Sequence, residues 1–188
     1  MTTIDEAFAR YPRGRFLPPT VRGWADDDRP LPIGHGQTNS QPSTVRQMLE
    51  WLDVHEGQRV CDIGSGSGWT TALLSALVGV HGHVIAVELL PALVKMGRHH
   101  CDEAGVANAE FHRAGKLFGW PKATPYDRIL VSAAAADLPH ELIGQLAIGG
   151  KLVIPVRQDI LVITRRTAER YDTRRHGGYV FVPLVRGS

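Results

Sequence analysis

The chain has 188 residues, 43% of them hydrophobic and 21% charged, which is ordinary for a single globular domain and excludes a disordered or fibrous protein. Its formal net charge of +2 is too small to indicate binding to nucleic acid or to an anionic membrane. The two cysteines, Cys61 and Cys101, form no CxxC motif. With no apolar run of membrane-spanning length and no apolar leader, these features predict a cytoplasmic protein.

The first 42 residues are rich in proline and lack sustained periodicity, so they are expected to form an irregular arm with one short helix near residues 4–11. A helix is then predicted from residue 43, with Pro42 in its first turn and Thr44 and Gln47 as a possible capping box. Its apolar face consists of Val45, Met48, Leu49 and Leu52.

The rest of the chain alternates between apolar strands and helices. Strands are predicted at 59–63, 83–87, 109–112, 128–132, 151–155, 160–164 and 179–182, and helices at 69–78, 90–104 and 138–146. Continuous apolar strands joined by helices indicate an α/β fold with a doubly wound, mostly parallel sheet. Because no helix separates the last two strands, they are expected to form an antiparallel hairpin. The arm (1–42) and the core (43–188) are expected to belong to one domain.

A glycine-rich turn follows the first predicted strand, in the sequence VCDIGSGSGW of residues 60–69. Gly64, Gly66 and Gly68 allow a sharp turn and a close approach of a ligand to the backbone, and the next helix offers unpaired N–H groups. The dinucleotide fingerprint G-x-G-x-x-G would need glycine where this chain has Trp69. The spacing therefore disfavours NAD or FAD as the ligand. The turn is expected to bind a different ligand, and the alternative is that it binds no ligand.

Glu88 ends the second predicted strand and should lie at the same edge of the sheet as the turn. A carboxylate there can accept hydrogen bonds from two ribose hydroxyls. Asp62 places a second carboxylate near the turn. Such a pair suits a cationic ligand such as S-adenosylmethionine better than a pyrophosphate.

The sequence of residues 31–42, LPIGHGQTNSQP, resembles the signature loop of the protein-L-isoaspartate O-methyltransferases. Further segments match that family in order, so the resemblance covers about residues 6–186. These segments are the glycine turn and residues 12–18, 125–129, 133–135, 145–155 and 181–184.

The resemblance implies a seven-stranded class I methyltransferase sheet with S-adenosylmethionine as cofactor. It implies methyl transfer to the free α-carboxylate of isoaspartyl residues in damaged proteins or peptides, whose esters then collapse to succinimides during repair. The expected partner is that substrate, with no nucleic acid, membrane or metal, and the chain is expected to act as a monomer. Ser40 aligns with the catalytic serine of the family. The residues expected to bind the cofactor are Thr38, Asp62, Gly64, Ser65, Gly66, Gly68, Glu88, Gly115 and Lys116.

The chain departs from the family pattern in three places. Asn39 replaces the usual isoleucine of the loop, and much of an N-terminal helical extension is missing. Residues 114–116, Ala-Gly-Lys, align with Gly-Asp-Gly, so Gly115 replaces an aspartate that receives the adenine amino group. Two alternatives therefore stay open: a carboxyl methyltransferase for one dedicated peptide or small molecule, and a catalytically decayed paralogue that only binds the cofactor.

The expected chemistry needs no general base, because a carboxylate is already ionised at neutral pH. Alignment of the reactants and exclusion of water should be sufficient. The histidine groups at 81–83 and 99–101 lack the spacing of a zinc site. The basic stretch 165–175 favours a solvated hairpin over a patch for acidic peptides. Trp69 and Trp120 are candidates for adenine contacts, although core or rim positions are equally compatible with their sequence context.

Overall fold

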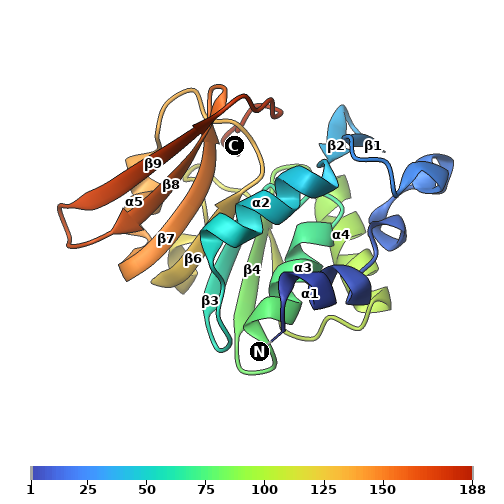
Figure 1. The fold of residues 1–188 in the computed structure, drawn as a ribbon, viewed down its shortest axis with the longest axis horizontal. Coiled ribbons are helices and arrows are strands. Elements are labelled where there is room, and N and C mark those ends of the chain that lie inside the picture. Colours follow the sequence, from blue (N-terminus) through green and yellow to red (C-terminus); the bar gives the residue numbers. More distant parts are fainter. Residues whose placement is uncertain (1, 188) are drawn as a thin grey trace.

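The computed structural model describes residues 2–187 and has a single central sheet (Figure 1). Its strand order is β5-β4-β3-β6-β7-β8-β9. The strands are β3 (Arg59–Ile63), β4 (His83–Glu88), β5 (Ala109–Arg113), β6 (Tyr126–Val131), β7 (Leu146–Val156), β8 (Asp159–Arg165) and β9 (Tyr171–Gly177). Pairing is parallel from β5 through to β7 and antiparallel between β7, β8 and β9. The predicted seven-stranded, mostly parallel α/β sheet with antiparallel C-terminal strands is confirmed.

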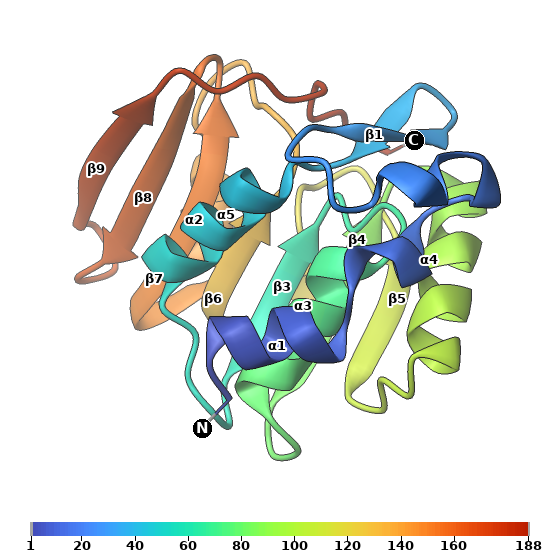
Figure 2. The ribbon, with the colours of Figure 1, turned by 45° about the vertical axis from the view of Figure 1, so that its right-hand side comes forward.

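The helices cover the two faces of the sheet unequally. α1, α2 and α3 lie over one face and α5 over the other (Figures 1 and 2). The first face carries the larger apolar cluster, which includes Leu49, Leu73 and Leu130, whereas the second cluster includes Ile129, Leu142 and Leu152. Because successive strand residues point to opposite faces, one short strand such as β6 contributes to both clusters. The helices are α1 (Ile4–Arg10), α2 (Pro42–Leu52), α3 (Trp69–Val78), α4 (Pro91–Glu103) and α5 (His140–Gly144), with 3₁₀ turns η1 (Arg13–Phe16), η2 (Pro19–Trp24) and η3 (Pro121–Ala123).

The arm is more ordered than its irregular sequence indicates. The predicted short helix is α1, but the signature loop also forms a two-stranded hairpin of β1 (Leu31–Gly34) and β2 (Gln37–Asn39), which the sequence did not indicate. Leu31 and Ile33 are buried against Leu93 of α4. The hairpin therefore packs on the core and lies beyond the carboxyl ends of the central strands, beside the C-terminal segment (Figure 2).

The predicted apolar face of α2 is confirmed, since Val45, Met48, Leu49 and Leu52 are all buried. The predicted capping box of Thr44 and Gln47 is wrong. The N-cap is Gln41, and the carboxylate of Asp28 in the arm instead accepts hydrogen bonds from the backbone N–H and hydroxyl of Ser43. A distant acidic side chain thus satisfies the start of this helix, which explains why no local capping signal was needed.

Two predictions near the C-terminus differ from the structure. Residues 179–182 form no strand, and the last strand is β9, which pairs with β8 from Asp159↔Gly177 to Arg165↔Tyr171. β9 is a largely exposed edge strand with charged side chains, so it lacks the apolar run by which the other strands are found. The predicted helix 138–146 is present but covers only His140–Gly144, since Leu146 already begins β7. Within residues 2–187, no helix is long and apolar enough to cross a membrane.

Candidate active site

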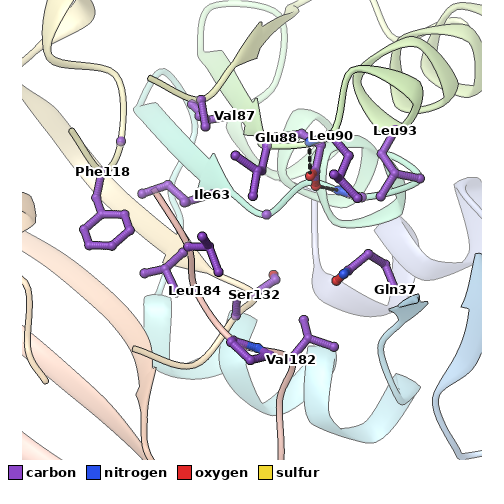
Figure 3. A pocket seen from close by; sticks show the side chains of 18 of the residues that line it. Gln37, Ile63, Val87, Glu88, Leu90, Leu93, Phe118, Ser132, Val182 and Leu184 are labelled. Carbon is purple, nitrogen blue, oxygen red and sulfur yellow. Dashed lines mark hydrogen bonds between the residues drawn. The ribbon is translucent and has the colours of Figure 1, made fainter. Parts of the chain in front are cut away.

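A cavity lies at the carboxyl edge of the sheet, where β3, β4 and β6 end (Figure 3). Segments far apart in the sequence line it: the glycine turn, the arm hairpin, the loops after β4, β5 and β6, and the C-terminal segment. Figure 3 shows Phe118 and Ile63 on one side of the cavity and Leu90, Leu93 and Gln37 on the other. Ligands of open α/β sheets bind at this edge, so the fold and the cavity indicate the same site.

The three glycines of the turn all have backbone conformations that disfavour other residues, with φ of 79° for Gly64, 52° for Gly66 and 90° for Gly68. Gly64 and Gly66 line the cavity. Gly68 has a packing role, because a Cβ there would lie 2.7 Å from the carbonyl oxygen of Gly97 in α4. The turn therefore exposes backbone to the cavity at its first two glycines and lets α4 approach at the third.

Glu88 lies at the end of β4, lines the cavity and is 93% buried, since only 7% of its surface is exposed. One carboxylate oxygen accepts a hydrogen bond from the backbone N–H of Gly66 (2.9 Å), and the other accepts one from Leu90 N–H (3.0 Å). A carboxylate can accept about four hydrogen bonds, so these two fix its position and leave capacity for ligand hydroxyls.

Asp62 lies beneath the turn and does not line the cavity. The hydroxyl of Thr71 donates to one carboxylate oxygen at 2.6 Å, whereas the other oxygen has no hydrogen-bond partner among the described residues. Burial, with a smaller contribution from the nearby charge of Glu88, raises the pKa of Asp62 to about 7, although the hydrogen bond from Thr71 acts in the opposite direction. The hydroxyl of Ser65 is likewise buried and unpartnered within residues 2–187.

Ala114, Gly115, Leu117 and Phe118, from the loop where the sequence predicts an adenine contact, line the cavity. A Cβ on Gly115 would have no atom within 4 Å, and the residue has no left-handed φ. Lys116 is exposed and outside the lining. Neither candidate tryptophan lines the cavity.

Those two tryptophans have other roles. The indole N–H of Trp69 donates to the carbonyl of Tyr11, and Trp120 stacks on His112 with ring centroids 4.2 Å apart.

The arm contributes Gln37 and Thr38 to the cavity wall. Ser40 follows β2 and is half-buried but does not itself line the cavity. Its carbonyl oxygen accepts a hydrogen bond from the guanidinium of Arg13 at 2.9 Å. The structure thus brings Thr38, Gly64, Gly66, Glu88 and Gly115 to one cavity and places the other candidates around it.

Sequence reasoning missed much of the wall between the sheet and the C-terminus. Ser132 after β6 and the segment from Val182 to Val185 line the cavity. Ala134 donates its N–H to the carbonyl of Val182 and accepts one from Leu184 N–H, which holds the segment against the loop after β6. Only the match of residues 181–184 to the family pattern pointed to this segment.

No group of histidine, cysteine and acidic residues in the described part of the chain could hold a metal ion. His83 and His112 instead lie within ion-pair distance of Glu110, at 3.2 and 3.3 Å. His99 lies 3.5 Å from Glu103 on the same helix.

The sequence pattern of the protein-L-isoaspartate(D-aspartate) O-methyltransferases matches residues 1–188. The chain belongs to this family. It is 44% identical over 185 residues to the protein-L-isoaspartate O-methyltransferase of Methanothrix thermoacetophila, covering 97% of this chain and 87% of the relative. It is 45% identical over 187 residues to that of Aeropyrum pernix, covering 97% and 72%.

Solved structures agree with these relatives. A protein-L-isoaspartate O-methyltransferase structure superposes with a TM-score of 0.87 at 26% identity, over 97% of this chain and 61% of the other, so this chain spans about three-fifths of that protein. A Plasmodium falciparum structure described as a putative member in complex with S-adenosylhomocysteine gives a TM-score of 0.86 at 25% identity, over 97% and 89%. The fold is that of a class I S-adenosylmethionine-dependent methyltransferase.

The residues present fit S-adenosylmethionine as cofactor. Backbone is open to the cavity at Gly64 and Gly66, where a side chain would need a strained φ, and a Cβ on Gly66 would lie 3.2 Å from Ile33 Cδ1. Glu88 offers free acceptor capacity beside the turn, and Leu117 and Phe118 provide apolar surface for a flat ring. Glu88 would hold the ribose, and Leu117 and Phe118 would hold the adenine.

Proposed function

We propose that this chain methylates the free α-carboxylate of L-isoaspartyl residues in damaged proteins or peptides, with S-adenosylmethionine as methyl donor. The observation that supports this most directly is the placement of the arm hairpin. It brings Gln37 and Thr38 into the same cavity as the glycine turn and Glu88, so an acceptor held by the arm would meet a cofactor held by the sheet.

The chemistry asks little of the protein beyond positioning. S-adenosylmethionine supplies an activated methyl group on a sulfonium, and an isoaspartyl α-carboxylate is already anionic at neutral pH. Hydrogen-bond donors that orient the carboxylate are therefore expected, and a general base is not. We assign this role to Ser40, with Thr38 beside it. The apolar wall from Val182 to Leu184 would keep water from the reacting oxygen.

Cofactor binding is assigned to Thr38, Gly64, Gly66, Glu88 and Gly115 at the cavity wall. Asp62, Ser65 and Gly68 would act from behind the turn, by supporting its conformation. Lys116 would contribute through its backbone, whose carbonyl accepts a hydrogen bond from Arg186 at 3.0 Å. We further propose that the chain forms one domain, arm included, and acts as a monomer on its peptide substrate.

The test is a methylation assay with radiolabelled S-adenosylmethionine on matched peptide pairs that differ only in isoaspartyl or aspartyl linkage. We expect label on the isoaspartyl peptide alone, and its release as methanol in mild alkali, because a carboxyl methyl ester is labile to base. Calorimetry with S-adenosylhomocysteine serves as the control for an intact cofactor site. Binding of S-adenosylhomocysteine without labelling of any isoaspartyl peptide would contradict the proposed acceptor and leave the cofactor assignment standing.

A further inference from the structure

Asn39 connects the two halves of the site through its side chain. It is the last residue of β2, between Thr38 of the cavity wall and Ser40, and only 6% of its surface is exposed. Its side-chain oxygen accepts a hydrogen bond from Arg13 Nε at 2.7 Å. Its side-chain nitrogen donates to the hydroxyl of Ser67 at 3.1 Å. Ser67 belongs to the glycine turn, so this one amide joins the arm to the turn.

The orientation of this amide is determined by its partners. A guanidinium can only donate hydrogen bonds, so the amide oxygen must face Arg13 and the NH₂ group must face Ser67. Ser67 is itself fixed, since it is 98% buried and its carbonyl oxygen lies 3.0 Å from His100 Nδ1 on α4. The link is therefore a series of contacts that runs from Arg13 of the arm through Asn39 to Ser67 of the glycine turn, and from Ser67 to α4.

The glycine turn has its own supports and does not depend on this link for its shape. Glu88 holds the N–H of Gly66, and the N–H of Gly64 donates to the carbonyl of Val87 at 2.8 Å. The loop of residues 37–41 in the arm depends more on the link through Asn39. The same Arg13 that binds the Asn39 side chain also donates to the carbonyls of Asn39 and Ser40 at 2.9 Å. Loss of the link should thus move the loop relative to the turn and leave the turn unchanged.

We propose that Asn39 is a positioning residue that sets the distance between the loop of residues 37–41, which would hold the acceptor, and the glycine turn, which would hold the cofactor. This inference rests on the proposed function, in which the acceptor carboxylate is held by the loop and the methyl donor by the turn. Methyl transfer needs both reactants in line, and a displacement of about 1 Å can lower the rate roughly 100-fold. The amide meets this need because it is donor and acceptor at once, which an apolar side chain of the same size is not.

Three variants test the inference. Asn39→Leu keeps the branching of the side chain at Cγ and removes both hydrogen bonds, and it should lower kcat/KM for an isoaspartyl peptide roughly 10- to 100-fold. Asn39→Asp still accepts from Arg13, and the Ser67 hydroxyl can rotate to donate to it, so this variant should recover most of the activity. Ser67→Ala breaks the same link from the other end, and combining it with Asn39→Leu should add little further loss.

Two readouts besides activity accompany the assay. The Kd of S-adenosylhomocysteine, measured by calorimetry, should stay within about threefold of wild type in all variants, because the turn keeps its own supports. Amide hydrogen exchange over residues 37–41 should be faster in Asn39→Leu than in Asn39→Asp, because the loop loses its connection to the turn. Assays are run below the Tm of each variant. If Asn39→Leu does not fold, Ser67→Ala and Asn39→Asp decide the question.

The inference is overturned if Asn39→Leu has a lower Tm but the kcat/KM of wild type, since Asn39 would then be merely structural. Equal impairment of the leucine and aspartate variants would overturn it as well. A wild-type chain that binds S-adenosylhomocysteine and fails to methylate isoaspartyl peptides overturns the proposed function instead. The two failures are distinguishable because the first leaves the wild-type enzyme active.

Discussion

Two buried charged residues flank the site, and they differ in how far hydrogen bonds satisfy them. Arg13, in the arm, is 95% buried and donates six hydrogen bonds, one to the Asn39 side chain and five to carbonyl oxygens. Asp62, beneath the glycine turn, is completely buried and receives one hydrogen bond, from Thr71. The arm is thus organised around a satisfied charge, whereas the cofactor turn is built over a poorly satisfied one.

This contrast shows how each region keeps its shape. The arm consists of short elements, and Arg13 gathers the carbonyls of residues 25, 27, 29, 39 and 40 around one planar group. The turn is positioned by the parallel strands on either side and by Glu88, so Asp62 can support it through its hydrogen bond from Thr71 without carrying a charge. Removing the charge of Arg13 should therefore destabilise the arm, whereas removing the charge of Asp62 should stabilise the region of the turn. The following predictions test these two expectations separately.

The largest effect is expected for Arg13→Ala. It leaves a set of half-buried carbonyls without donors, and each unsatisfied polar group carries a penalty, so we expect a loss of about 3–5 kcal/mol in the free energy of unfolding. Urea denaturation measures it. Arg15→Ala is the matched control, because Arg15 is exposed and its side chain makes one hydrogen bond within residues 2–187, to the carbonyl of Glu103. The control should lose less than about 0.5 kcal/mol, and equal losses would refute the organising role of Arg13.

A pH-dependent effect of the opposite kind is expected for Asp62→Asn. The pKa of Asp62 is raised from 3.8 to about 7 in the fold, chiefly by burial. The folded chain therefore keeps a proton that the unfolded chain has released, and wild-type stability falls as the pH rises from about 4 through 7. The asparagine variant carries no such charge. Its stability relative to wild type should rise by roughly 2–3 kcal/mol between pH 5 and pH 8.

The control for this experiment is Asp26→Asn, since Asp26 is exposed. Its difference from wild type should stay constant over the same pH range. Denaturation curves for the three proteins at pH 5, 6, 7 and 8 give the comparison. A constant difference for the Asp62 variant as well would mean that the carboxylate is better solvated or paired than its burial indicates.

On the arm side of the site, Ser40→Ala should lower turnover while leaving the cofactor site intact. One charge-assisted hydrogen bond to the acceptor is worth roughly 1.5–3 kcal/mol, or about 10- to 150-fold in kcat. The Kd of S-adenosylhomocysteine should not change, because Ser40 does not line the cavity and its carbonyl stays bound to Arg13. Ser43→Ala, which removes only a hydroxyl bound to Asp28, should leave turnover unchanged. Equal activity of both variants would exclude Ser40 from the mechanism.

Much of the cofactor side could be predicted from the sequence because its signals are local. Apolar runs locate β3 and β4, and parallel pairing of Ile63 with Val87 brings the strand ends together. Gly64 and Gly66 follow the end of β3 and Glu88 is the last residue of β4, so their place at one edge is a consequence of the fold class. The glycine spacing alone did not separate the cavity wall from packing positions, and Gly68 proved to contact α4.

The rest of the site depends on contacts between distant segments, which leave no periodic signal. Arginine is seldom buried, so nothing in the composition of the arm marks Arg13 as its centre. The Val182–Leu184 wall is held by backbone hydrogen bonds to Ala134, which any side chain allows. β9 was misplaced because its exposed residues are charged, while the apolar run at 179–182 looked more strand-like.

The smallest expected effect concerns Gly115, on the cofactor side. An adenine amino group that lacks a carboxylate acceptor loses a charge-assisted hydrogen bond. Water or a carbonyl replaces part of this interaction, so the loss in the free energy of cofactor binding is about 1 kcal/mol. The sequence left open whether Gly115 needs a conformation closed to other residues. Its φ is not left-handed and its Cβ position is open, so aspartate can be accommodated.

Gly115→Asp should therefore tighten S-adenosylhomocysteine binding by roughly 5- to 10-fold, with a smaller gain for an analogue that lacks the 6-amino group. Gly115→Ala, which adds a side chain without an acceptor, should show no gain. The backbone hydrogen bond from Gly187 to the Gly115 carbonyl is retained in both variants, so the C-terminal segment should keep its place. Calorimetry with the two ligands measures the difference. If the aspartate variant matches wild type for both ligands, position 115 does not face adenine, and the cofactor lies differently in the cavity.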